Sequence, residues 1–187
     1  MDLAWGDERT KKFVTNIGLI TSNGPYGHDI MAAEWAHHVS YNPGIIAISI
    51  RQADATHENI TKTKEFGVNL AAHDQNVLSS VAGNYTGKEV DKIAVLKELG
   101  YKFFKASKIN VLMVDASMNA ECELIKKIVI GDHTTFIGEV VYLYPANNKE
   151  PLVYHAQKYW KLNTLVEKPN PDELDKIKGI VERFRKK

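Results

Sequence analysis

The sequence predicts a mainly β protein: a small antiparallel barrel with peripheral helices and one helix appended at the C-terminus. β-branched and aromatic residues gather in a series of short stretches bounded by turn signals. The helical patterns between these stretches are short, whereas a doubly wound parallel sheet alternates its strands with long helices. The second half of the chain is a continuous antiparallel pattern that contains a hairpin. Together these observations favour a barrel.

Composition places the chain among ordinary globular proteins. Its 187 residues suit a single domain, and 44% hydrophobic with 25% charged residues exclude a disordered chain. Lys and Arg number 24 against 23 Asp and Glu, so the net charge of +1 gives no attraction to nucleic acid or an anionic membrane surface. The N-terminus lacks a signal-peptide pattern, and no apolar stretch approaches the ~20 residues of a membrane span. We therefore expect a cytoplasmic protein.

Three stretches predict strands in the first half of the chain. Phe13–Ser22 is rich in β-branched residues and stops at the turn signal Asn23-Gly24-Pro25. Gly44–Arg51 is apolar at nearly every position, as in a strand that is buried on both faces. Phe66–Ala72 is the third stretch.

Three short helices are expected around these strands, because a polar side chain stands where it can accept from the free backbone N–H groups of a first turn. Gly residues follow them at positions that suit a helix end. The expected helices are 56–64 with Thr56 as the cap, 75–81 with Asp74 as the cap, and 91–99 closed by Gly100.

The second half predicts the strands Ile109–Ser117, Ala120–Ile130 and Thr134–Tyr144, with a shorter one at Leu152–His155. Gly131-Asp132-His133 stands at the hairpin position between the two longest. Neither face of the last long strand is consistently polar, as in a barrel wall that is covered on its outside.

Capping signals predict an amphipathic C-terminal helix over residues 171–186. Asn170 at the N-cap and Glu173 form a capping box, with Pro171 at the first helical position. The apolar residues at helical spacing share one face: Leu174, Ile177, Ile180, Val181 and Phe184.

Several familiar chemistries lack their motifs. The chain has no G-x-G-x-x-G for a dinucleotide fold, no P-loop and no G-x-S-x-G nucleophile elbow. His57-Glu58 is followed by Thr61 rather than His, so the zincin motif is incomplete. His37 and His38 are neighbours on an extended stretch and point to opposite faces, which makes a poor chelate. We predict no metal site. The single cysteine, Cys122, excludes an intrachain disulfide and is expected to be a core residue.

Four segments, in this order and spacing, resemble the flavin reductase-like, FMN-binding split-barrel family, which includes flavoredoxins and small flavin reductases. Each segment combines a strand-like run with polar residues at its end. The segments are Asp29–Ala36 with Val39–Arg51, Thr56-x-x-Asn59-Ile60 with Glu65–Leu70, Glu121-Cys122-Glu123 with Gly131–Val140, and Pro151–Tyr154 with Tyr159-x-x-Leu162.

The resemblance implies a six-stranded antiparallel split barrel, with a barrel core of about residues 13–162 inside one domain that spans 1–187. It also implies a homodimer with non-covalent FMN at the barrel mouth near the interface, and NAD(P)H as a transient co-substrate. Asp29 departs from the family pattern, which usually has Asn at this position.

The resemblance further implies a set of site residues. His133 would lie beside the flavin, where a histidine can orient the nicotinamide or move a proton near neutral pH. Arg51 would offer a planar donor fork to the phosphate next to the helix start at Thr56. The cofactor-binding set is Ala32, Ala33, Glu34, Trp35, Ser49, Ile50, Arg51, Thr56, Asn59, Ser80, Lys92 and Tyr159.

Each of these residues also has an ordinary structural interpretation. An arginine at a strand end often pairs with a carboxylate, and Thr56 and Asn59 are common in the first turn of a helix. Lys92 suits a solvated helix face, and a histidine at a hairpin tip needs no function.

Three functions therefore remain open at this stage. The leading hypothesis is an FMN-dependent oxidoreductase that takes hydride from NAD(P)H and passes electrons to flavin, a ferric complex, oxygen or a partner protein. The alternative is a non-enzymatic FMN electron carrier. The third is a barrel that binds no flavin and serves as an interaction module.

Overall fold

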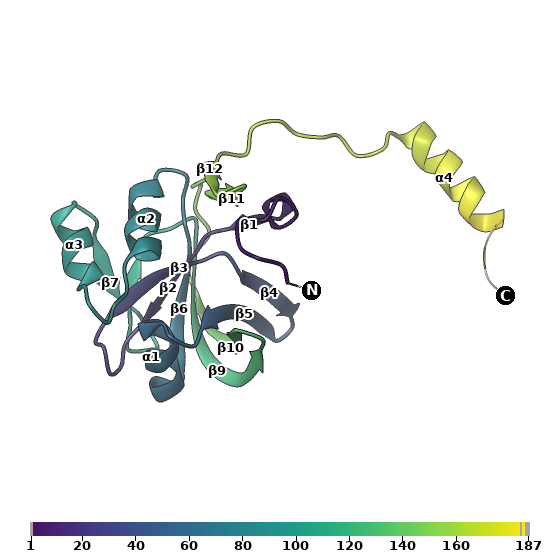
Figure 1. The fold of residues 1–187 in the computed structure, drawn as a ribbon. Coiled ribbons are helices and arrows are strands. Elements are labelled where there is room, and N and C mark those ends of the chain that lie inside the picture. Colours follow the sequence, from purple (N-terminus) through teal and green to yellow (C-terminus); the bar gives the residue numbers. More distant parts are fainter. Residues whose placement is uncertain (1, 184, 186–187) are drawn as a thin grey trace.

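The computed structural model describes residues 2–183 and 185, and its body is a β barrel flanked by short helices (Figure 1). The strands are β1 Val14–Asn16, β2 Gly18–Ser22, β3 Asp29–Ala33, β4 Ala36–Tyr41, β5 Gly44–Arg51, β6 Glu65–Leu70, β7 Phe103–Lys105, β8 Leu112–Val114, β9 Met118–Ile130, β10 His133–Leu143, β11 Val153–His155 and β12 Lys158–Trp160. The helices are the 3-10 turn η1 Thr10–Lys12, α1 Ala55–Thr63, α2 Asn76–Asn84, α3 Lys92–Glu98 and α4 Pro171–Arg183.

The main sheet closes on itself. Within the described residues its seven strands run in the order β3-β2-β6-β9-β10-β5-β4, and each neighbouring pair is antiparallel. The two edge strands, β3 and β4, are consecutive in the chain and are separated only by Glu34 and Trp35. They therefore act as two halves of one interrupted strand, and the sheet forms the expected six-stranded barrel with a split between them.

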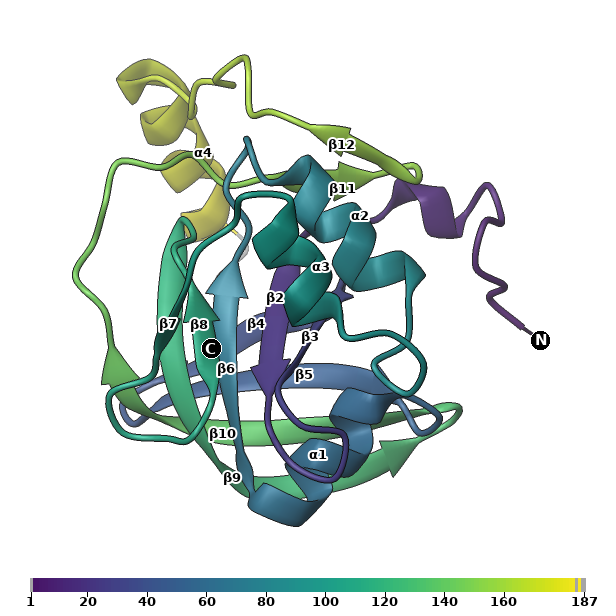
Figure 2. The ribbon, with the colours of Figure 1, turned by 90° about the vertical axis from the view of Figure 1, so that its left-hand side faces the viewer.

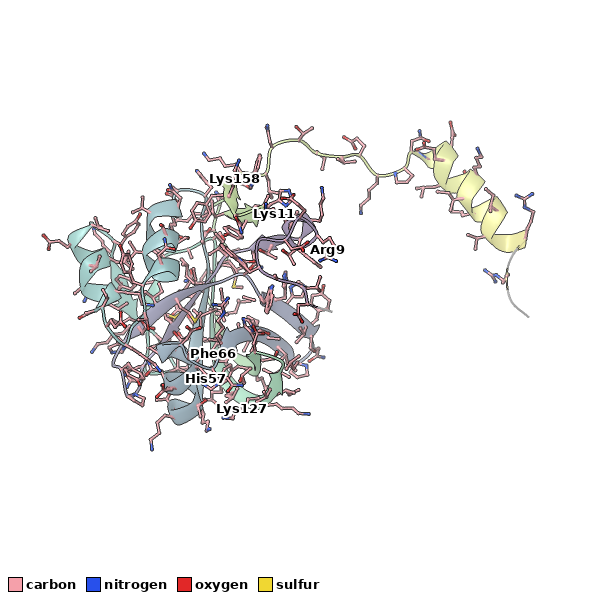
Figure 3. All side chains as sticks on the ribbon, in the orientation of Figure 1. Arg9, Lys11, His57, Phe66, Lys127 and Lys158 are labelled. Atoms are coloured by element: carbon pink, nitrogen blue, oxygen red, sulfur yellow. The ribbon has the colours of Figure 1, made fainter. Side chains whose placement is uncertain are left out.

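Small residues permit this closure. A Cβ added to Gly18 of β2 would lie 2.6 Å from the Cβ of Ala36 of β4, so any side chain here would force the two strands apart. A Cβ on Gly138 of β10 would lie 2.5 Å from Cζ of Phe66, which fills the barrel interior (Figure 3). Burial of such a ring contributes about 1.5–3 kcal/mol.

Of the three buried apolar clusters among the described residues, two position the elements around the split in the barrel. The first fills the barrel and joins all the barrel walls; its largest fully buried members are Ile20, Ile48, Ile50, Ile60, Phe66 and Phe136. The second packs α2 and α3 against the outer side of β2 and β3, through Leu19, Ile30, Leu78 and Leu96 among others (Figure 2). Because α2 is fixed against β3, its residues come to lie beside the split in the barrel.

Some predicted elements differ from the structure. Gly44–Arg51 is confirmed as β5, whereas Phe13–Ser22 divides at Ile17 into β1 and β2, which pair with different partners. Of Ile109–Ser117 only Leu112–Val114 is a strand. Four of the described strands were not predicted, namely β3, β4, β7 and β12; most of β4 is exposed and therefore lacks an apolar alternation.

Two helix caps were assigned to the wrong residues. The first helix begins at Ala55 after Asp54, so Thr56 lies inside it and its hydroxyl donates to Asp29 instead. Gln75, not Asp74, precedes α2. The expected helix 91–99 is α3, and Asp91 is its N-cap rather than its first residue, because the Asp91 carboxylate accepts from Ala94 N at 2.9 Å.

The C-terminal helix stands apart from the body at the end of an extended segment (Figure 1). Its capping box is confirmed: Asn170 Oδ1 accepts from Glu173 N at 3.0 Å, and Glu173 Oε2 accepts from Asn170 N at 2.9 Å. Of the predicted helix 171–186, Phe184 and Lys186 lie outside the described residues. None of the helices in the described ranges is long and apolar enough to cross a membrane.

Candidate functional site

A cleft of about 1100 Å³ lies at the split of the barrel. Residues from β3, the end of β5, the start of α1, α2, the β9–β10 hairpin, the N-terminal segment and the β11–β12 hairpin line it. All predicted site residues except Asn59 are among them: Ala32, Ala33, Glu34, Trp35, Ser49, Ile50, Arg51, Thr56, Ser80, Lys92, His133 and Tyr159.

Strand β3 forms one wall of the cleft along its length. Asp29 stands at its first residue, and Glu34 follows its last. At about 3.3 Å per residue, these two positions are roughly 16 Å apart. Met31, Ala32 and Ala33 line the wall between them. The cleft can therefore hold an elongated ligand whose two ends meet different chemistry.

The Asp29 end of the cleft is polar and buried. Lys92 Nζ lies 3.1 Å from Asp29 Oδ1, and the Thr56 hydroxyl donates to Asp29 Oδ2 at 2.9 Å. Gly87 closes over this pair, since a Cβ there would lie 2.5 Å from Asp29 Oδ1. An ammonium carries three N–H donors, and within the described part of the chain only Asp29 engages that of Lys92. Lys92 therefore keeps donors for a ligand.

Ser79 adds an unused polar group to the cleft. Its side chain is 1% exposed and lines the cleft, yet its Oγ has no hydrogen-bond partner among the residues that the structure describes. A buried hydroxyl without a partner is costly, about 1–3 kcal/mol. Because this hydroxyl lines the cleft, a polar ligand or solvent there would supply the missing partner.

Arg51 and the start of α1 form the cationic part of the wall. The Asp54 side chain makes no capping bond, so it satisfies none of the first N–H groups of α1. Arg51 is exposed, lines the cleft and takes part in no ion pair of residues 2–183 and 185. A guanidinium beside a free helix N-terminus suits a phosphate.

His133 lies at the rim beside Arg51. The register of β10 on β5 pairs the two residues directly. The His133 ring stands 4.6 Å from the Trp35 ring, centroid to centroid, and its Nδ1 lies 2.7 Å from Asp132 Oδ1. The hydrogen bond from His133 holds the pKa of the Asp132 carboxyl below its ordinary value. An ionised carboxylate only accepts, so Nδ1 carries a proton and Nε2 is left for a ligand.

The Glu34 end of the cleft is aromatic. Trp5 Nε1 donates to Glu34 Oε1 at 3.5 Å, and the Tyr154 and Tyr159 rings stand 5.8 Å apart. Burial and then the Glu34 charge raise the pKa of the Tyr154 phenol. All four residues line the cleft.

Asn59 is not brought to the cleft. Its amide nitrogen donates to Ser22 Oγ at 3.1 Å and to Gly27 O at 3.0 Å, and its Oδ1 accepts from Tyr26 N at 3.1 Å. The side chain is fully buried and supports the loop before β3. The structure thus favours the ordinary structural interpretation of Asn59.

Sequence reasoning did not name Trp5, Asp29 and Tyr154 as site residues, and all three line the cleft. Trp5 belongs to no motif, and its place depends on how the N-terminal segment folds back. Ser79 was not in the predicted cofactor-binding set either, since only the burial of its hydroxyl without a partner among the described residues distinguishes it.

The residues present fit the expected FMN. A phosphate monoester matches the donors of Arg51, Lys92 and the α1 start, and a planar ring matches the flat wall of Ala32 and Ala33. The Ser79 hydroxyl, which has no partner among the described residues, offers a further hydrogen bond to a polar ligand.

Comparison with known proteins agrees with this geometry. A family model described as "Flavin reductase like domain" matches residues 10–163. An uncharacterized protein of Archaeoglobus fulgidus is 28% identical over 118 residues, which are 62% of this chain and 64% of that protein. The FMN reductase (NADH) RutF of Stutzerimonas stutzeri is 22% identical over 148 residues, 79% of this chain and 82% of that one.

Among solved structures, the flavin reductase PheA2 superimposes with a TM-score of 0.72 at 29% identity and covers 88% of this chain and all of that one. The matched family range spans the whole barrel and the cleft wall, apart from the first residues of the chain. The sequence resemblance is thereby confirmed, together with the split-barrel fold. The chain belongs to the flavin reductase-like domain family.

Proposed function

We propose that this protein is an FMN-binding oxidoreductase of the flavin reductase type, which uses NAD(P)H as the hydride donor. The observation that carries the proposal is a cleft in which Lys92, Arg51 and the start of α1 offer donors beside the buried Ser79 hydroxyl, which has no partner in the part of the chain that the structure describes. The relative from Stutzerimonas stutzeri, named an FMN reductase (NADH), supports it.

Each part of the cleft has a distinct task in this proposal. Arg51 and the first N–H groups of α1 bind the phosphate, and Lys92 and Ser79 donate to polar atoms of the ligand. The backbone of Ala32 and Ala33 lies against the ring. The chemistry that FMN supplies when bound is acceptance of a hydride equivalent and onward electron transfer.

His133 orients the co-substrate. Asp132 fixes the ring of His133 through a hydrogen bond from Nδ1. Nε2 is therefore left to form a hydrogen bond with a group that enters over the rim. His133 either donates to the carboxamide of a nicotinamide or moves a proton at Nε2. Trp35 packs against the ring and limits its rotation.

Absorbance of the purified protein tests the proposal. We expect a flavin band near 450 nm after incubation with FMN, and FMN rather than FAD in the supernatant after denaturation, because no motif accommodates an adenosine. NAD(P)H oxidation should then be measured with and without added free flavin. FMN binding without NAD(P)H oxidation would favour the non-enzymatic electron carrier, and no flavin binding would reject both.

We also propose that the protein acts as a homodimer. Large apolar side chains are exposed on β4 and on the distal half of β9, for example Tyr41 at 88% and Val129 at 64%. Exposed large apolar side chains favour an interface. Sedimentation equilibrium, which gives the mass in solution, tests this; the mass of one chain would reject it.

A further inference from the structure

The N-terminal segment, residues 2–9, precedes the range that the family model matches, yet its first residues line the cleft. Its own hydrogen bonds give it a defined shape. Asp7 N donates to Ala4 O at 3.0 Å, and the Thr10 hydroxyl donates to Ala4 O at 3.0 Å and to Asp7 O at 2.8 Å. Arg9, labelled in Figure 3, pairs with Asp7 at 2.8 Å. The segment is therefore an ordered turn, held by its own hydrogen bonds.

This turn is held against the rest of the cleft at two points. Gly6 has a φ of 88°, and a Cβ there would lie 2.9 Å from Gln157 Nε2, so the backbone passes close to the β11–β12 turn. Trp5 reaches Glu34, which follows β3, through its indole N–H at 3.5 Å. The two contacts place Trp5 over the Glu34 end of the cleft.

Exposed aromatic rings surround a single carboxylate at this end. Trp5 is 68% exposed and Trp35 is 52% exposed, and both line the cleft together with Tyr154 and Tyr159. In the described part of the chain, Glu34 forms no ion pair with a Lys or Arg. Large rings left this open to water are typical of a surface that a ligand covers.

The chemistry of this group selects its ligand. Aromatic faces carry negative potential and attract cationic or electron-poor planar rings, and an unpaired carboxylate adds to the attraction. The same end repels a phosphate, which belongs with Arg51 and Lys92. The oxidised nicotinamide ring is a planar pyridinium cation, and the oxidised flavin ring is planar and electron-poor.

We propose that Trp5, held by Glu34, is a specificity residue of this chain that covers a planar, electron-poor ring in the cleft, supplied by the oxidised nicotinamide of the dinucleotide. This rests on the proposed function, because the oxidised dinucleotide is what remains in the cleft after the hydride has been donated. Trp5 adds to the family cleft a wall that the matched domain does not include.

The test compares Trp5→Leu and Glu34→Gln with a matched control, Trp160→Phe. Trp160 is also exposed, at 48%, but its N–H is bound to His155 O at 2.9 Å and it does not line the cleft. Titration calorimetry on FMN-loaded protein measures the Kd of NAD⁺ and of ADP-ribose, which lacks the nicotinamide ring. Flavin fluorescence measures the Kd of FMN.

We expect Trp5→Leu to raise the Kd of NAD⁺ about 3- to 30-fold, the range of a ring–cation contact. The Kd values of ADP-ribose and FMN should stay within about twofold. Glu34→Gln should act in the same direction, and Trp160→Phe should change nothing. A rise in the Kd of FMN alone would show that Trp5 covers the flavin ring and not the nicotinamide ring.

Unchanged Kd values for both NAD⁺ and FMN in Trp5→Leu would overturn the inference. Failure of the wild-type protein to bind FMN would instead reject the proposed function, so the two failures are distinguishable. Trp5 is exposed and its substitution removes no core packing, so a folding defect does not obscure the result.

Discussion

Lys92 Nζ lies 3.1 Å from Asp29 Oδ1, with the two side chains only 2% and 3% exposed. This ion pair joins the start of α3 to the start of β3 at the polar end of the cleft, and Thr56 of α1 donates to the same carboxylate. One carboxylate therefore sets three elements around the place where the ligand is expected. Its charge also balances an ammonium that would otherwise be buried alone.

Asp29→Asn should destabilise the ligand-free protein by about 3–5 kcal/mol, because it leaves the Lys92 charge buried without its partner. Urea unfolding measures the change. The double variant Asp29→Asn/Lys92→Met should recover part of the loss. Asp175→Asn is the control, since its pair with Lys178 is exposed and worth less than about 1 kcal/mol. Equal losses of unfolding free energy in Asp29→Asn and Asp175→Asn would show that the buried pair stabilises the fold no more than the exposed pair does.

Arg51→Ala should weaken FMN binding by about 10- to 150-fold, which corresponds to the ~1.5–3 kcal/mol of a charge-assisted hydrogen bond. Because Arg51 is exposed at a strand end, the free energy of unfolding should change little. Flavin fluorescence titration gives the affinity, with Lys158→Ala as a control outside the cleft. An FMN affinity equal to that of wild type would show that Arg51 is an ordinary strand-end residue with no role in FMN binding.

Ser79→Ala separates ligand binding from stability. The ligand-free variant should be as stable as wild type or more stable, because the removed hydroxyl has no partner among the described residues. FMN affinity should fall by about 2- to 12-fold, the value of one hydrogen bond. A loss of stability without a change in affinity would contradict the assignment.

His133→Ala should slow hydride transfer to bound FMN by about 100-fold or more, the usual worth of an orienting or acid–base group. FMN affinity should change much less, because the phosphate donors lie elsewhere. Anaerobic stopped-flow absorbance at the flavin band, after mixing with NADH or NADPH, measures the rate. Flavin reduction at the wild-type rate would remove His133 from the site.

Glu121 predicts a pH dependence of stability. It is fully buried; burial alone would raise its pKa, but hydrogen bonds from the Tyr144 hydroxyl and from the amides of 107–109 outweigh this and hold the pKa below its ordinary 4.5. A lowered carboxyl pKa stabilises the fold above the unfolded value of 4.5, and this stability is lost as the pH falls through the folded pKa.

The free energy of unfolding of wild type should therefore fall as the pH drops below about 4.5. Glu121→Gln should lower it by about 2–4 kcal/mol at neutral pH and flatten this acid limb. The exposed neighbour Glu123→Gln is the control. An acid limb that is identical in Glu121→Gln and wild type would assign the effect to other carboxyl groups.

Prediction from sequence succeeded where a local signal dominates. The strand Gly44–Arg51, the β9–β10 hairpin and the capping box at Asn170 each follow from apolar pattern or capping chemistry within a few residues. Prediction failed for β4, since exposed residues such as His37, His38 and Tyr41 do not alternate in polarity. It failed again for the cap at Thr56, because the hydroxyl prefers Asp29, 27 residues away.

The sequence by itself determined the mainly β class, the barrel strands with continuous apolar pattern, and a family resemblance whose predicted site residues, apart from Asn59, all line the cleft. Only the tertiary structure decided that β3 and β4 are halves of one split strand, that Asn59 supports a loop, and that Ser79 and Trp5 belong to the cleft. The physical reason is the distance along the chain over which each interaction acts. Propensity and capping act over a few neighbouring residues, whereas a partner for a buried hydroxyl, a counter-charge or a ring is set by segments that closure of the barrel brings together.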